Sequence, residues 1–536
     1  MKYSEYINRG GKRKKASNET SSKIGQGAAP KISKDLKQML DNIERELGAS
    51  PDLTIRHVQI GGEDPLQAAT VYMDGLVNSV AVNDFVMRSL LENSVVTSPD
   101  MSRVPEEILQ FILNRALELG DAKIKSDWND MMIAILSGYT LILLDGCNKA
   151  IVGDTKGGEG RSITEPSSQL VIRGPKDAFV ESVNTNISLI RRRIKSPKLW
   201  FEFMNIGTVT NTDVAILYIK DRADDKIVDE VRTRLKKIDI EAVLESSYIE
   251  QLIQDKVFTP FPTLYNTERP DVVAANLLEG RIALIVDGTP FVLILPTVFA
   301  QFFQSTDDYA QRFDIATLMR LVRYISFIIL LLGPSIYIAL TTFHYEMIPT
   351  PMLISLLAQR ENVPFPAAIE AVLMEIAFEI LREAGTRMPR AVGQTVSVVG
   401  ALILGQAVVE AGIITPVMVI VVALTGIASF AIPAYNLAIA GRIIRFGFII
   451  VASLFGFYGI TLGLIVLVAH LNSLRSFGVP YLSPFSPFSL RGQKDTLVRV
   501  PMWMISLRPH KTKNADNTAS IDDGLSSSGK DGRTDA

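Results

Sequence analysis

Cysteine is almost absent from this sequence, because Cys147 is the only one among 536 residues. A single thiol excludes an internal disulfide framework and is typical of a reducing compartment for the segment that contains it. Histidine is scarce as well, and no Cys or His pair has the spacing of a zinc site. The sequence therefore indicates neither a disulfide-bonded secreted domain nor a zinc protein.

Recognisable catalytic and nucleotide-binding motifs are missing too. The stretch GDTKGGEGRS has the glycines of a phosphate-binding loop, but it lacks the Gly-Lys-Ser/Thr ending and no clear helix follows it. No nucleophile, base and orienting group form a recognisable set. The basic run RRRIK comes without a nucleic-acid-binding motif. We therefore expect a protein that is not an enzyme, holds no metal or cofactor and binds no nucleic acid.

Charge is nearly lacking between residues 391 and 472, although charged residues make up 21% of the chain. The mean hydropathy of +0.22 is high for a chain with that much charge, so the sequence has two unlike parts. The basic N-terminus, NRGGKRKK, has no apolar stretch behind it. We expect no cleavable signal peptide, and we expect internal apolar segments to drive membrane insertion.

Apolar segments follow Arg320. Residues 324–343 carry no charge and match the roughly 20 residues that cross about 30 Å of hydrocarbon. TVSVVGALILGQAVVEAG and ITPVMVIVVALTGIASFAI are two further candidates. Residues 443–474 are too long for one upright span and too short for two, and Gly456, Gly459 and Gly463 would permit a bend or a re-entrant path. We expect about four to six membrane helices.

Arginines flank these spans and predict their orientation. They are Arg320, Arg323, Arg382, Arg387, Arg390, Arg442 and Arg445. Positive residues concentrate on the cytosolic side, so the soluble region before the first span is expected there. The last apolar segment has arginine on both flanks, which leaves the parity of the crossings and the side of the C-terminus open.

The soluble region has the pattern of two α/β subdomains, at residues 35–160 and 165–290. Asp145-Gly146 and Asp287-Gly288 each stand between apolar runs, which is a hairpin signal. The glycine-rich stretch at 153–162 separates the subdomains as a linker. The predicted fold is a multi-pass α-helical membrane domain preceded by a cytosolic α/β region of two subdomains.

The remaining boundaries follow from composition. Residues 1–34 and 511–536 lack periodicity and are predicted to be disordered tails, the first of them basic. Residues 291–319 form an interfacial connector, 320–474 the membrane domain and 475–510 a C-terminal segment.

An acidic stripe is the most informative polar feature. Glu375, Glu379 and Glu383 recur every fourth residue, which places them on one helical face, and Glu370 lies near them. At membrane depth each carboxylate would need a partner or water, as in an ion path. The alternative is an interfacial helix whose acids face solvent or pair with Arg382 and Arg387. The candidate cation path consists of Glu370, Glu375, Glu379, Gln406 and Glu410.

Small residues recur every fourth position on the next apolar segment. They are Gly393, Ser397, Ala401 and Gly405, on a helix that starts near Val392. This spacing lets helix backbones approach closely, either within one subunit or between identical subunits around an axis.

A basic run, Arg191, Arg192, Arg193 and Lys195, lies on a predicted helix of the second subdomain. Such a run is usually a solvated face, and its functional alternative is a patch that binds anionic lipid headgroups.

Several long runs together resemble one family. They are GPKDAFVESVNTNISLIRRRIKSPKL, EGRIALIVDGTPFVLILPTVF, QSTDDYAQRF, VPFPAAIEAVLMEIAFEILREAGTRMPRAVGQTVSVVGALILGQAVVEAG and VIVVALTGIASF. In this order they resemble the A subunit of the GerA-type spore germination nutrient receptors, densely over residues 165–500 and loosely before that. Only the two tails depart visibly from the family.

The resemblance implies a function and partners. Members are membrane proteins of the endospore that help a dormant cell sense nutrients and begin germination, so the spore inner membrane is the expected location. The implied partners are a transporter-like B subunit, a lipoprotein C subunit, monovalent cations and further copies of the chain, assembled as a pentamer around a cation-conducting pore.

Three other functions remain open at this stage. A member of the same family acts as an accessory channel associated with dipicolinate release. A monomeric secondary transporter would have inverted internal repeats, and none is visible. A pure scaffold would leave Glu375, Glu379 and Glu410 without a function.

Overall fold

The computed structural model describes residues 32–60, 66–88, 90, 105–113, 122–157, 165–166, 169, 171, 173–387, 405–501 and 504. These residues form two compact units. The first comprises the described residues before 162 together with Ile187–Glu202, and the second comprises the others. Residues 32–34 of the first predicted tail are described, and the Lys34 carbonyl accepts from the backbone N–H of Gly146. The rest of both predicted tails, and half of the predicted linker, lie outside the described residues.

The first sheet has the strand order β1-β2-β4-β5-β3, with antiparallel neighbours throughout. Its strands are β1 (Leu53–Ile60), β2 (Leu66–Met73), β3 (Ala122–Lys125), β4 (Thr140–Leu144) and β5 (Ala150–Gly153). Its helices are α2 (Leu36–Glu46), α3 (Ser79–Ala81), the π-helical η1 (Val82–Met87), α5 (Pro105–Phe111) and α6 (Trp128–Ile135). Side chains alternate across strand β4, so α2 and α6 cover one face of the sheet while η1 and α5 cover the other.

The second sheet repeats this design. Its order is β6-β7-β9-β10-β8, which is the order of the first sheet when the strands are counted from β6. The strands are β6 (Leu199–Ile206), β7 (Thr212–Ile219), β8 (Tyr265–Thr267), β9 (Ile282–Val286) and β10 (Val292–Leu295). The helices are α7 (Val183–Arg193), α8 (Asp225–Lys236), α9 (Ser246–Ile253) and α10 (Pro270–Leu278). In both regions a helix precedes two strands, and the third strand is followed by a helix and a final hairpin.

The two Asp-Gly turns have equivalent hydrogen bonds, which supports a structural repeat. Asp145 accepts from the backbone N–H of Leu36 at the start of α2 (3.1 Å), and Asp287 accepts from that of Val183 at the start of α7 (3.0 Å). The following glycines adopt positive φ and donate to the segment before the same helix. Both predicted hairpins are confirmed, as β4–β5 and β9–β10.

Several predicted limits need correction. Strand β10 lies beyond residue 290 yet pairs with β8 and β9, so part of the predicted connector belongs to the second sheet. The first long apolar helix begins at Phe313, before Arg320.

The basic run of α7 is not a continuous surface patch, because Arg191 is buried. Ile187, Ile190 and Ile194 are buried on the same helical face, and this periodicity turns Arg191 inward with them. Its guanidinium donates to Asp52 (2.5 Å), to Ser50 and to the Leu199 carbonyl. Of the other three residues, Arg192 and Lys195 are exposed and Arg193 is half-buried.

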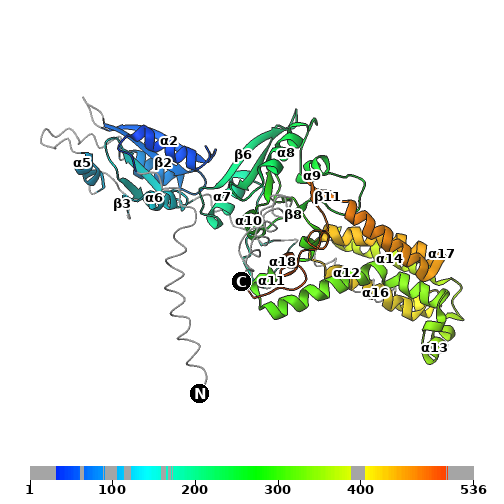
Figure 1. The fold of residues 1–536 in the computed structure, drawn as a ribbon. Helices are drawn as coiled ribbons and strands as arrows, with labels where there is room; N and C mark the ends of the chain where they lie inside the picture. Colours follow the sequence, from blue (N-terminus) through cyan, green and yellow to red (C-terminus); the bar gives the residue numbers. More distant parts are fainter. Residues whose placement is uncertain are drawn as a thin grey trace, which may run out of the picture. The chain divides into compact units, whose positions relative to one another are not determined.

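A bundle of helices occupies the chain after residue 313. It contains α12 (Phe313–Thr342), α14 (Ala367–Arg387), α16 (Pro416–Phe430) and α17 (Tyr435–Ser473), with the short α13 (Thr350–Arg360) at one end (Figure 1). Within the described residues, α12 and α17 are long and apolar enough to cross a membrane, and α16 is apolar but shorter. Most of the candidate span before α16 lies outside the described residues.

Helix α17 is a hairpin of two antiparallel arms. The backbone of Gly456 is non-helical (φ 58°, ψ −138°). A Cβ on Gly463 would lie 2.8 Å from the Phe448 ring, and one on Gly459 would lie 2.5 Å from the Val451 carbonyl oxygen. In a straight helix Phe448 and Gly463 would be over 20 Å apart, so the chain reverses at Gly456. The predicted bend is confirmed, and it is a complete turn.

Contacts give the directions of the helices. The turn at Gly456 touches Phe343, which ends α12. Glu370 near the start of α14 bonds Thr415 just before α16, and Arg382 near the end of α14 bonds Ser429 near the end of α16. Helices α14 and α16 are therefore parallel.

The C-terminal segment returns to the second sheet. Strands β11 (Arg475–Ser476) and β12 (Val479–Pro480) form a small hairpin after α17. The buried Ser476 hydroxyl donates to the Thr263 carbonyl (2.7 Å) and accepts from Thr297 N (3.0 Å). Both ends of the helical bundle thus connect to the same sheet.

Removing the Arg191 side chain should open the first unit. Arg191→Ala leaves Asp52 without its cation, which we expect to cost about 3 kcal/mol of unfolding free energy. Cys147 is 1% exposed, and burial raises the pKa of its thiol, so it reacts slowly in the folded unit. We expect thiol labelling of the purified chain in mild urea to accelerate about a hundredfold.

Arg192→Ala is the matched control, because the neighbouring Arg192 is exposed and donates to the Gly157 carbonyl. It should leave the labelling rate nearly unchanged. Equal rates for the two variants would show that the Arg191 pair does not hold the first unit.

Candidate functional site

An ionic cluster lies where α14, α16 and α17 meet. We define it as Glu375, Glu379, Arg382, Arg442 and Arg445. The acids and Arg382 come from α14, and the other two arginines come from the first arm of α17. Local sequence explains the arrangement on α14, because residues three and four apart share a helical face.

The centre of the cluster is fully buried. Glu375 and Arg445 are both 0% exposed, and their side chains form an ion pair. Thr425 of α16 donates its hydroxyl to the Glu375 carboxylate (3.4 Å). Removing either charge alone would leave the other buried and uncompensated.

Glu379 sits at the edge of the cluster and joins three arginines. Its carboxylate oxygens lie 2.8 Å from Arg442, 3.3 Å from Arg382 and 3.6 Å from Arg445. Arg382 also donates to the Ser429 hydroxyl at 3.1 Å, which ties the cluster to the end of α16.

The balance of charge in this cluster is positive. Two carboxylates face three guanidinium groups, which leaves one positive charge in excess. Among the described residues, Nε and Nη1 of Arg445 have no hydrogen-bond partner although they are buried. The cluster thus fits a structural link between helices better than an open row of acids that attracts cations.

Glu370 lies apart from the ionic cluster and is also buried. Its carboxylate accepts from the backbone N–H and the hydroxyl of Thr415, both at 2.9 Å, and Arg360 lies 3.9 Å away. Thr415 is the N-cap of α16, where a negative charge is favoured by the helix dipole. Glu370 therefore fixes the start of α16 against α14.

Gln406 and Glu410 are placed differently from the other acids of the predicted path. Both lie on helical backbone, four residues apart, and both are exposed in the single chain. Gly405 packs toward Val419 of α16, since a Cβ there would lie 3.8 Å away. The other residues of the predicted packing stripe, at 392, 393, 397 and 401, lie outside the described residues.

The spacing of the acids places them on one helical face, but it does not indicate the arginines that pair with them from α17. Arg442 and Arg445 were interpreted only as flanking charges that set orientation. Their position near an apolar run was the available signal, because an ionisable residue among apolar helices needs a partner.

A second charged group lies where α12 begins. Arg320 is 0% exposed and donates to Asp308 (2.8 Å) and Asp495 (3.0 Å), while Arg323 pairs with Asp308 as well. Asp308 belongs to α11 (Asp307–Ala310), and Asp495 follows α18 (Leu490–Gln493). These pairs lock the start of the bundle to the C-terminal segment. No group of three or more His, Cys, Asp or Glu residues in the described part of the chain is arranged to hold a metal ion.

Comparison with known proteins gives consistent matches. Residues 41–511 match the family model described as Bacillus/Clostridium GerA spore germination protein. Spore germination protein KA of Bacillus subtilis (strain 168) is 52% identical over 90% of this chain and 88% of its own length. Spore germination protein GerLA of Bacillus cereus is 40% identical over 90% of this chain and 97% of its own length.

One solved structure is also similar. It is the crystal structure of the N-terminal domain of the A subunit of the Bacillus megaterium spore germinant receptor GerK3. It is 43% identical, has a TM-score of 0.41, and covers 51% of this chain and 98% of its own.

Breaking the central pair of the ionic cluster should destabilise the bundle, whereas removing both charges should not. Glu375→Gln and Arg445→Met, made singly, should each cost about 3 kcal/mol because one buried charge remains. The double variant should recover most of that loss. The measurement is the thermal unfolding midpoint of the purified full chain in detergent.

The exposed pair Glu383 and Arg387, at 62% and 80% side-chain exposure, supplies the control. Glu383→Gln should shift stability by less than about 0.5 kcal/mol. Additive losses in the Glu375 and Arg445 double variant would mean that the two side chains do not interact as described.

Proposed function

Because the chain belongs to the GerA family of spore germination proteins, we propose that it is the A-type subunit of a germinant receptor. In this proposal copies of the chain surround a nutrient-gated cation path in the spore inner membrane. The family is one of receptor subunits rather than a class of enzymes. A transporter-like B subunit and a lipoprotein C subunit are the proposed partners.

The observation that carries the membrane assignment is the distribution of polarity in the bundle. Charged side chains such as Arg320, Glu375 and Arg445 are fully buried, while large apolar side chains such as Ile450 and Tyr458 are more than half exposed. A bundle in water would have the opposite distribution. Lipid around the bundle explains both halves of the pattern.

Helix directions support an even number of crossings. Helix α12 leaves the side of the second sheet, and the second arm of α17 returns to it through the β11–β12 hairpin. The first arm, about 21 residues long, spans roughly 30 Å at 1.5 Å per residue, which suits one crossing. The soluble region and the C-terminal segment would then both face the cytosol.

An oligomer supplies what a single chain lacks. The acids of α14 are already paired within the described part of one subunit, so they provide no open row of carboxylates. On α12, exposed apolar residues recur at helical spacing on one face: Leu318, Leu321, Val322, Ile325 and Ile328. This face is suited to packing against a neighbouring subunit, and the family resemblance implies a pentamer.

The proposed cation path lies along the chain segment before α16, where the small-residue stripe leads to Gln406 and Glu410. A ring of subunits would turn one exposed Glu410 into several carboxylates around an axis, which attracts cations and repels anions. Glu375 and Glu379 shape cation access indirectly, because their contacts hold α14, α16 and α17 together. Glu410 is the residue to mutate in a test of charge selectivity, because arginines neutralise Glu375 and Glu379.

The topology can be tested with single cysteines in a Cys147→Ser background. Met347→Cys lies beyond the end of α12 at a 66% exposed position, and Leu490→Cys lies in the C-terminal segment at a 75% exposed position. In growing cells that express the chain, a membrane-impermeant thiol reagent should label residue 347. Residue 490 should react only after permeabilisation.

Labelling of residue 490 in intact cells, with protection of residue 347, would show that the chain has the opposite orientation in the membrane to the one proposed. Labelling of both positions in intact cells would contradict an even number of crossings through a sealed membrane.

Cation selectivity should depend on Glu410. We expect Glu410→Gln to lower the preference for K⁺ over Cl⁻ about tenfold in vesicles that contain the receptor subunits, because the ring loses its charge. Glu383→Gln is the control, since Glu383 is exposed on α14 and pairs with Arg387. If the Glu410→Gln protein assembles normally and its ion selectivity is unchanged, Glu410 does not line the cation path.

A further inference from the structure

We propose that the loop at residues 255–259 is a membrane anchor of the second subdomain. Val257 and Phe258 insert at the boundary between lipid headgroups and acyl chains, and Lys256 lies among anionic headgroups. The inference rests on the proposed function in one respect, because it takes the bundle to lie in a membrane.

The tip of this loop is unusually exposed for its chemistry. Phe258 is 94% exposed and Val257 is 60% exposed, although they are adjacent apolar residues at the tip of one loop. Leu252 and Tyr248 of α9, just before the loop, are also exposed. Neighbouring exposed apolar side chains of this kind mark a surface that is covered by something other than water.

Hydrogen bonds and an ion pair hold the base of the loop in place. The Val257 and Phe258 side chains are therefore kept exposed at its tip. Asp255 pairs with the guanidinium of Arg234, which also donates to the Ile253 carbonyl. Thr259 donates its backbone N–H to the Val257 carbonyl (3.0 Å), closing a tight turn. The Thr259 hydroxyl accepts from the N–H of Phe261, whose ring is buried.

The depth of the loop relative to the bilayer is set by its contact with α17. The Thr259 hydroxyl lies 3.0 Å from His470 Nε2, and the Phe261 ring is 6.2 Å from the His470 ring. The exposed apolar residues of the second arm end immediately before His470: Leu462, Ile465, Val466 and Val468.

Polar residues follow at once, with Asn472, Ser473 and Arg475 exposed. His470 therefore marks the edge of the apolar band, and the loop stands beside that edge. Aromatic side chains are enriched at this level of a bilayer.

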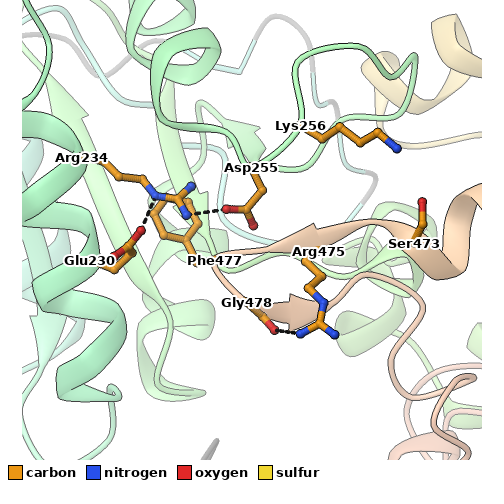
Figure 2. A pocket seen from close by; sticks show the side chains of 8 residues that line it. All are labelled: Glu230, Arg234, Asp255, Lys256, Ser473, Arg475, Phe477 and Gly478. Atoms are coloured by element: carbon orange, nitrogen blue, oxygen red, sulfur yellow. Dashed lines mark hydrogen bonds and ion pairs between the residues drawn. The ribbon is translucent and has the colours of Figure 1, made fainter.

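Positive charge accompanies the apolar tip. Lys256 and Arg475 line the same pocket as Ser473, and Arg475 donates to the Gly478 carbonyl (Figure 2). Arg234 in this pocket is already neutralised, because Glu230 and Asp255 both pair with it. The exposed Lys256 thus adds charge complementarity to phosphate headgroups at the membrane surface.

The experiment places a tryptophan at the tip of the loop. The full chain with Phe258→Trp is reconstituted in vesicles of phosphatidylcholine and phosphatidylglycerol, with and without lipids that carry a nitroxide quencher near the headgroup. The signal of the parent chain, which has three tryptophans, is subtracted. We expect emission from residue 258 at shorter wavelength than in water, and a marked loss of it when quencher lipid is present.

Two matched variants separate the possible failures. Ile465→Trp reports on the apolar band of α17, and Val209→Trp reports on an exposed turn between β6 and β7. If quencher lipid does not affect residue 465, the membrane assignment of the bundle itself fails. If residue 465 is quenched while residue 258 behaves like residue 209, only the loop proposal is overturned.

The role of charge is tested by Lys256→Gln in the Phe258→Trp chain. We expect this change to reduce quenching in vesicles with phosphatidylglycerol and to have little effect in pure phosphatidylcholine. An equal effect in both lipids would overturn the part of the proposal that assigns anionic headgroups to Lys256.

Discussion

A guanidinium that is buried among apolar helices must have carboxylates beside it, and this constraint governs the helical bundle. Arg445 is buried with Glu375 on one side and Glu379 on another. Because the acids lie on α14 and the arginine on α17, the pair fixes two elements that are about 70 positions apart in sequence. Removing one member would cost far more than the pair contributes in net stability. The ionic cluster therefore chiefly determines which helices pack against one another.

Further polar contacts join the bundle to the segments that flank it and to the second sheet. Asp308 stands before α12 and Asp495 after the last helix, and Arg320 joins both. The hydroxyl of Ser476 connects the end of α17 with the second sheet through Thr263 and Thr297. A change in the second subdomain thus has a direct physical route to both ends of the helical chain.

Local sequence patterns predicted the elements better than their partners. The apolar runs gave α12 and α16, and the Asp-Gly pairs gave both hairpins, because these signals reside in a few adjacent residues. Gly456 was expected to permit a bend, but only the contacts of Gly463 reveal a full reversal.

The repeat of the two sheets was not predicted, since it lies in strand order and hydrogen bonds rather than in a motif. Arg191 was assigned to a surface patch because composition alone cannot show which face of a helix turns inward. For the candidate site, the spacing placed the acids correctly on one face of α14. Their arginine partners lie on α17. Ion pairs between helices that are distant in sequence produce no local sequence pattern, so these partners could not be predicted.

The central claim is that the cation path lies between copies of the chain. We propose it because Glu370, Glu375 and Glu379 are all held by partners within the described residues of one subunit. The most direct test is the native mass of the full chain in lipid nanodiscs. After the mass of lipid and belt protein is subtracted, the account predicts a single species that contains several copies of the 59.0 kDa chain, with five as the expected number. A stable species of one copy that conducts cations by itself would contradict it.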